Sequence, residues 1–152
     1  MVIILSISLI ALLTTYVILV TYRNKSYFNN MVGMMISMTN SMMASVSMGT
    51  IFGIVLRDKD LSISTILSIT IGLLVGLITG GPLSYIAILD GVLAGVMGGM
   101  MGAMLGIMLQ ESYSNLMISF IDLVFIIVIG ILLRFIKDEI HINKEDNQLR
   151  EY

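Results

Sequence analysis

Two blocks of methionine residues are the part of this sequence whose residue types and spacing could support chemistry. Residues 31–42 read MVGMMISMTNSM and residues 97–108 read MGGMMGAMLGIM, with five methionines at the same intervals in each block. The second block begins 66 positions after the first. The matching residues are Met31, Met34, Met35, Met38 and Met42 in one block, and Met97, Met100, Met101, Met104 and Met108 in the other. Thioether sulfur is a soft, neutral ligand that favours Cu(I) over hard cations such as Mg²⁺.

Helical spacing separates these methionines from the glycines around them. At ~100° per residue, the methionines of residues 97–108 lie within ~100° of one another, whereas the glycines between residues 91 and 106 lie on the opposite side. The same calculation places the methionines of residues 31–42 on one face, which Ser45, Gly49 and Gly53 continue. Asn40, with Ser37, Ser47 and Gly33, lies roughly opposite and forms a polar face suited to hydrogen bonds between helices.

We expect the two methionine faces to turn toward a shared protein interior, where thioethers one turn apart can supply two or three sulfurs to one ion. Asp90 lies on the methionine face, and an intramembrane carboxylate normally faces protein, water or a cation. The candidate metal path comprises Met31, Met35, Met38, Met42, Met97, Met101, Met104 and Met108, with Asp90 drawing cations at its inner end.

The elements that must position these residues are membrane helices. The chain has 152 residues, of which 57% are hydrophobic and only 12% charged, about half the charged share of a soluble domain. Five apolar stretches reach the length of a transmembrane helix, and they are uniformly apolar rather than alternating as in a barrel strand. The sequence therefore predicts an all-α integral membrane protein with spans at about 2–22, 29–56, 61–79, 83–109 and 116–136.

Basic residues indicate how these spans are oriented. Arg23, Lys25 and the basic residues from Arg134 onward would lie on one side, and Arg57 and Lys59 on the other. Since basic residues favour the cytoplasmic side, we expect the N-terminus outside and the C-terminus in the cytoplasm. Residues 1–137 then form a single transmembrane domain and 138–152 a polar cytoplasmic tail. The first span lacks the features of a cleavable signal peptide, and a bacterial plasma membrane is the expected location.

Small residues at every fourth position indicate how the third and fourth spans associate. Membrane helices pack through close backbone approach, which such residues permit. The third span ends in the turn Gly80-Gly81-Pro82, so we expect an antiparallel hairpin packed through its glycines. The helix-packing residues are Gly72, Gly76, Gly80, Gly91, Gly95, Gly98, Gly99, Gly102 and Gly106.

Depth within the bilayer leaves two arrangements open. In this topology the second and fourth spans run in the same direction, which places residues 31–42 in the inner half and residues 97–108 nearer the outer half. The two blocks would then form a staggered ladder of thioethers across most of the bilayer. The 66-residue repeat instead favours equal depths, and the sequence does not decide between them.

Short motifs in these spans resemble those of high-affinity copper uptake transporters, which carry Met-x-x-x-Met on one helix and Gly-x-x-x-Gly on another. The resemblance covers a few helical turns: Met38 to Met42, Met104 to Met108, Gly72 to Gly76 and Gly91 to Gly95. It implies that Met38, Met42, Met104 and Met108 are candidate ligands of Cu(I), the one cofactor or cargo that the sequence suggests.

Two other functions remain open. A methionine stripe can be a pliable contact surface, so the chain could be a non-catalytic packing or assembly subunit. It could also be an oligomeric channel in which Asp90 and Asp122 line the pathway, although Asp122 could equally hydrogen-bond a neighbouring Ser or Thr. An enzyme is not expected, because the sequence has no cysteine, one histidine and no nucleophile paired with a base. The expected partners are the lipid bilayer and a second copy or another membrane protein, and no basic face indicates nucleic acid.

Overall fold

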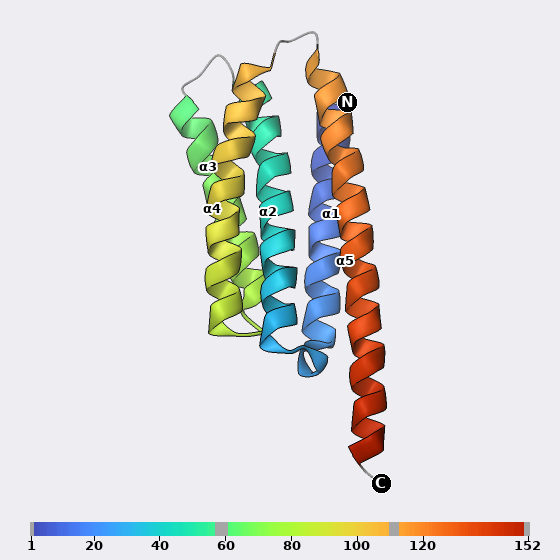
Figure 1. Cartoon of the computed structure of the whole chain (residues 1–152). Coiled ribbons are helices and arrows are strands. Elements are labelled where there is room, and N and C mark those ends of the chain that lie inside the picture. Colours follow the sequence, from blue (N-terminus) through green and yellow to red (C-terminus); the bar gives the residue numbers. More distant parts are fainter. Residues whose placement is uncertain (1, 57–60, 110–112, 151–152) are drawn as a thin grey trace.

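Five long α-helices make up the fold, shown in Figure 1 for a computed structural model of the chain. The structure describes residues 2–56, 61–109 and 113–150, and the side chains of 3–56, 62–109 and 113–142. The helices are α1 (Val2–Arg23), α2 (Asn30–Val55), α3 (Leu61–Gly80), α4 (Tyr85–Met108) and α5 (Ser114–Arg150), with a short 3₁₀ helix, η1 (Lys25–Tyr27), between α1 and α2. Successive helices alternate in direction, so the two ends of the chain lie at opposite ends of the bundle (Figure 1). The described residues contain no strand, as the all-α prediction requires.

Local sequence explains the sharp reversal between α3 and α4. Gly80, Gly81 and Pro82 end α3, since proline lacks the N–H that a continuing helix needs. Ser84 then caps α4, because its hydroxyl accepts a hydrogen bond from the backbone N–H of Ala87 at 3.2 Å. The connection is therefore short enough to lay α4 directly back along α3 (Figure 1).

The helices pack in two different ways. α2, α3 and α4 approach one another closely through small residues. α1 and α5 instead join α2 through large apolar side chains that form one buried cluster: Ile10, Val17, Val32, Ile36, Ile51, Phe125, Ile129, Leu132 and Ile136. α2 is thus the central helix, in contact with all four others.

Four of the helices are long and apolar enough to cross a membrane: α1, α3, α4 and α5. α2 has the length but carries many serines, most of them buried among its neighbours. α5 differs from the expected span of 116–136, because it continues as one helix of 37 residues into the predicted polar tail. The first 20 residues of α5 carry one charged residue, Asp122, whereas charged residues are frequent from Arg134 onward, and no proline or glycine near residue 137 interrupts the helix. Arg57 and Lys59, used to predict the orientation, lie outside the described residues.

Candidate functional site

A seam of small residues runs between the parallel helices α2 and α4. On α2 the seam consists of residues four positions apart, and each lies against a glycine of α4. The facing residues are Ser37 and Gly91, Ser41 and Gly95, Ser45 and Gly98, Gly49 and Gly102, and Gly53 and Gly106. The approach is close: a Cβ added to Gly49 would lie 3.0 Å from the Cα of Gly102. A side chain at any of these glycines would therefore push the two backbones apart.

The seam winds around α2 because of its four-residue spacing. Four residues advance a helix by ~400°, so each step turns the contact face by ~40° beyond a full turn. From Ser37 to Gly53 the contact face consequently moves by ~160°. The contact face begins at Ser37, away from the methionine face of α2, and ends on that face, since Gly49 and Gly53 share the direction of Met31 and Met35. α4 therefore crosses over the methionine side of α2 in the second half of α2, as Figure 1 shows near the top of the bundle.

The same seam continues into α3 through hydrogen bonds and further glycines. Ser41 donates to the carbonyl of Gly72 at 2.8 Å, and Asn40 Nδ2 donates to Thr79 Oγ1 at 3.1 Å. Ser37 donates to the carbonyl of Gly76 at 3.4 Å. Asn40 and Ser37 belong to the polar side of α2 that the sequence predicts opposite the methionines, whereas Ser41 is not assigned to it. Asn40 is fully buried, and its Oδ1 accepts no hydrogen bond from the residues that the structure describes.

The glycines of α4 divide between two neighbours. A Cβ added to Gly95 would lie 2.5 Å from the carbonyl oxygen of Gly72 on α3, and one added to Gly99 would lie 2.8 Å from the backbone nitrogen of Ile69. Gly98, Gly102 and Gly106 instead meet atoms of α2. The prediction that these glycines all pack the third helix against the fourth is therefore wrong for Gly98, Gly102 and Gly106, which pack α4 against α2. Sequence reasoning placed α2 and α4 side by side through their methionines and missed their contact through small residues, although the series Ser37, Ser41, Ser45, Gly49 and Gly53 was its signal.

The methionines lie on the outside of the molecule, which corrects the expectation of a shared interior. We use the name methionine stripe for ten residues: Met31, Met34, Met35, Met38, Met42, Met97, Met100, Met101, Met104 and Met108. Eight of them expose between 47% and 75% of their surface, and Met34 and Met42 are half-buried. The reason is that the small residues on the other side of α2 and α4 permit the closest helix contacts, and these contacts turn the methionines outward.

The two methionine blocks nevertheless form one continuous stripe. The seam pairs Ser37 with Gly91 and Gly53 with Gly106, so residues of α4 lie level with residues of α2 that come 54 or 53 positions earlier. The blocks are 66 positions apart, which leaves an offset of 12 or 13 residues, about the length of one block. Met97 is therefore level with residues 43–44 and follows Met42 directly. The two blocks are therefore staggered along the helices rather than level with each other.

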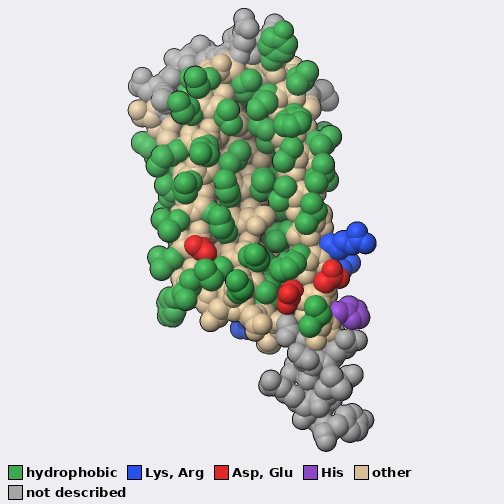
Figure 2. All heavy atoms as spheres, viewed as in Figure 1, with side chains coloured by type: hydrophobic (Ala, Val, Ile, Leu, Met, Phe, Trp, Pro, Cys, Tyr) green, Lys and Arg blue, Asp and Glu red, His purple; other side chains and the backbone are tan. Residues whose placement is uncertain are grey.

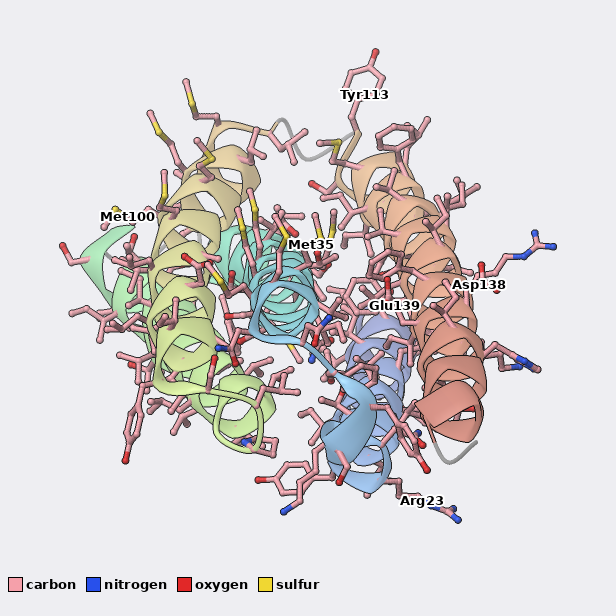
Figure 3. The ribbon with its side chains drawn as sticks, turned by 60° about the horizontal axis from the view of Figure 1, so that its bottom comes forward. Arg23, Met35, Met100, Tyr113, Asp138 and Glu139 are labelled. Atoms are coloured by element: carbon pink, nitrogen blue, oxygen red, sulfur yellow. The ribbon has the colours of Figure 1, made fainter. Side chains whose placement is uncertain are left out.

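Both blocks also project to the same side of the bundle. Most sulfur atoms lie in the upper half of Figure 3, with the labelled Met100 at the left and Met35 near the middle, and this half corresponds to the face turned to the viewer in Figure 1. Figure 2 shows hydrophobic side chains over most of this face, with charged ones gathered toward its lower end. At 1.5 Å per residue, two blocks of 12 residues end to end span ~36 Å, which exceeds the ~30 Å thickness of a bilayer's hydrocarbon core.

Two carboxylates lie toward opposite ends of the bundle and differ in their surroundings. Asp90, in the second turn of α4, is half-buried, lies level with Ile36 and Ser37, and makes no hydrogen bond or ion pair with the described residues. Asp122 of α5 accepts a hydrogen bond from the buried hydroxyl of Ser6 on α1. Asp122 thus takes part in the contact between α1 and α5, whereas Asp90 is free to interact with a cation.

Beside the stripe, a shallow groove of about 320 Å³ lies between α2 and α5, lined by Met35, Thr39 and apolar residues of α5. Within the described residues, no group of three or more His, Cys, Asp and Glu side chains lies close enough together to hold a metal ion.

No protein family, curated protein or solved structure matches this chain. The methionine stripe and Asp90 therefore have to be interpreted from their geometry.

Proposed function

We propose that the chain is a polytopic membrane protein whose five helices all cross the bilayer, with its N-terminus outside and its C-terminus in the cytoplasm. Four helices have the required length and apolarity, and the serines and Asn40 of α2 are buried against its neighbours, which shields these polar side chains from lipid. Arg23 and Lys25 lie at the end of the bundle toward which α5 carries its own basic residues. Basic residues at that end favour the cytoplasmic side.

In this proposal, α3 and α4 form a hairpin held together by glycine contacts within the bilayer. Lipid gives apolar side chains no reason to leave it, so helices associate through close backbone approach and hydrogen bonds between helices. Support comes from Gly72 of α3 and Gly95 of α4, whose lack of side chains allows the two backbones to touch.

The proposed activity is the binding of a soft monovalent cation, Cu(I) in the cell, along the methionine stripe. The observation that carries this proposal is the end-to-end alignment of two methionine blocks into one ladder about as long as the bilayer is thick. Successive weak sites of this kind allow an ion to enter and to move on. Lipid contact alone does not require methionine, and exposed positions of α1 and α5 carry mainly leucine, isoleucine and phenylalanine.

Asp90 supports the same role at one end of the stripe. It is the single charged residue of α2 and α4, and it lies on the methionine side of α4. A carboxylate without a partner raises the local concentration of cations. We expect Asp90→Asn to lower the affinity for Ag(I) by roughly three- to tenfold at low salt, with the thioether sites intact.

Binding of Ag(I) to purified protein in lipid nanodiscs tests the proposal, because Ag(I) is a redox-stable substitute for Cu(I). A variant in which Met38, Met42, Met104 and Met108 are replaced by Leu should bind Ag(I) at least about tenfold more weakly, since Leu keeps the volume but lacks sulfur. The matched control replaces Met43, Met48 and Met117 by Leu, which removes three sulfurs outside the stripe. Circular dichroism should show the same helicity in all three proteins. Equal Ag(I) binding by the stripe variant and the control would refute the proposal.

The outward direction of the thioethers favours a second candidate, a packing or assembly subunit. Unbranched methionine side chains adapt to irregular partner surfaces, and here they are exposed along a whole face. In that case neither the wild-type protein nor the stripe variant would bind Ag(I), so the two would not differ in metal binding. The function would then depend on shape, and larger or β-branched residues on the stripe would weaken the association that leucine preserves.

A further inference from the structure

The methionine stripe provides only half of the surroundings that a cation needs. Two sulfurs one turn apart, such as those of Met38 and Met42, can contact an ion from one side. The other side of that ion is not covered by this chain, since the stripe methionines are exposed. A cation facing acyl chains is strongly disfavoured in a bilayer. A site that holds the ion therefore needs donors from a second molecule at the same depth.

We propose that the soft cation binds between two copies of this chain, arranged stripe to stripe about a twofold axis parallel to the helices. This inference rests on the metal-binding role proposed above. Both copies keep the same orientation in the membrane under such an axis, and residues that lie on the axis face their own counterparts at equal depth. A pair of methionines on the axis therefore meets an identical pair, and an ion between them has up to four sulfurs around it. Any other partner would need its own thioethers at matching depths.

The size of the face is consistent with a second copy. The stripe is ~36 Å long, and α2 with α4 is about two helix diameters wide, or ~20 Å. The resulting area is on the order of 700 Å² per copy, close to the ~800 Å² per partner of a standard stable interface. Apart from Asp90, no charged residue of α2 or α4 would have to be buried.

Asp90 makes this association depend on the cation. The twofold arrangement brings two Asp90 carboxylates toward each other at one end of the stripe, and like charges in a medium of low dielectric constant repel strongly. A cation held near them removes this repulsion. Binding of the ion and association of the two copies should therefore strengthen each other, since any two linked equilibria are coupled reciprocally.

The test uses full-length protein in detergent and in nanodiscs, with Ag(I) as the probe. Because the chain has no cysteine, Leu93→Cys places a single spin label on the exposed methionine side of α4, level with Thr39 of α2. Leu12→Cys places the control label on exposed α1, outside the α2–α4 face. Labelling blocks the thiol, so neither variant adds a free thiol ligand. Bound Ag(I), the mass of the complex and the distance between labels are measured on the same samples.

We expect Ag(I) to lower the dissociation constant of the dimer by at least about tenfold and to produce a short distance between Leu93 labels, with a longer one between Leu12 labels. If Ag(I) binds and the mass stays that of a single chain, the shared site is wrong and the metal-binding role stands. A dimer in which the labels at position 12 are closer together than those at position 93 would also overturn the shared site. So would a dimer whose dissociation constant does not change when Ag(I) is added. If Ag(I) does not bind at all, both proposals fail.

Discussion

Replacing Gly95 by alanine should destabilise the bundle, although alanine favours helices more than glycine does. Gly95 lies where α2, α3 and α4 meet. An added Cβ would be 2.5 Å from the carbonyl oxygen of Gly72 and 2.6 Å from Ser41 Oγ, whereas ordinary contacts are 3.4–4 Å. Both neighbouring helices would have to retreat by about 1 Å, and overpacking of this kind costs about 1–3 kcal/mol.

The net effect follows from two further contributions. Retreat of α2 from α3 weakens the hydrogen bond from Ser41 to Gly72, and such bonds contribute on average ~0.6 and at most ~1.7 kcal/mol in membranes. Alanine returns ~1 kcal/mol through its helix propensity. We therefore expect Gly95→Ala to lower the free energy of unfolding by roughly 1–3 kcal/mol, which combines those contributions.

Gly130 of α5 provides the matched control, because a Cβ there would meet nothing within 4 Å. Gly130→Ala should be neutral or stabilise the protein by up to ~1 kcal/mol. The two variants should then differ by roughly 5–10 °C in melting temperature, measured by size-exclusion chromatography after heating. Pulse proteolysis in an SDS titration should show the same order in the free energy of unfolding. Equal stability of Gly95→Ala and Gly130→Ala would refute the conclusion that close backbone contact holds α2, α3 and α4 together.

Two further predictions concern the contact between α1 and α5 and the alignment of the methionine blocks. Ser6→Ala removes the donor to Asp122 and should lower the free energy of unfolding by about 1–2 kcal/mol in the same proteolysis assay, and no change would indicate that this bond contributes nothing. A protein with Met42→Cys and Met97→Cys should form an intramolecular cross-link with a short bismaleimide, while Met31→Cys with Met97→Cys should not, because only the first pair is level. A cross-link in the second pair alone would mean that the blocks lie at equal depths.

Sequence spacing predicted which residues of α2 and α4 share a face, because that depends only on the ~100° advance per residue. It did not predict which face is buried. In a soluble protein the methionines would enter the core, since burial removes apolar surface from water. Between helices in lipid this driving force is absent, so the residues that allow the closest contact, Ser41 and Gly95 among them, occupy the interior instead.

The register between α2 and α4 was likewise beyond the sequence alone, because it depends on which small residues meet. The 66-residue repeat favoured placing Met31 level with Met97, but methionines on the outer faces of the two helices do not set the helix contact. The observed pairing of Ser37 with Gly91 instead continues without interruption for four more steps to Gly53 and Gly106. The five consecutive pairs of small residues determine the register of α2 and α4, because the 66-residue repeat involves only methionines that face outward.

The seam and the methionine stripe are consequences of the same arrangement. The methionines on the outer face of α2 end at Met42. From Ser45 onward α4 covers that face, and the methionines on the outer face of α4 begin at Met97. A shift of α4 by one four-residue step would move the blocks ~6 Å apart or into overlap, and would break the continuity of the ladder. Glycine at Gly49 and Gly102 fixes this register, because it lets α4 lie on α2 where the first block ends. The continuity of the methionine stripe therefore depends on residues that contain no sulfur, and a metal path along the stripe requires α2 and α4 to stay in contact along the whole seam.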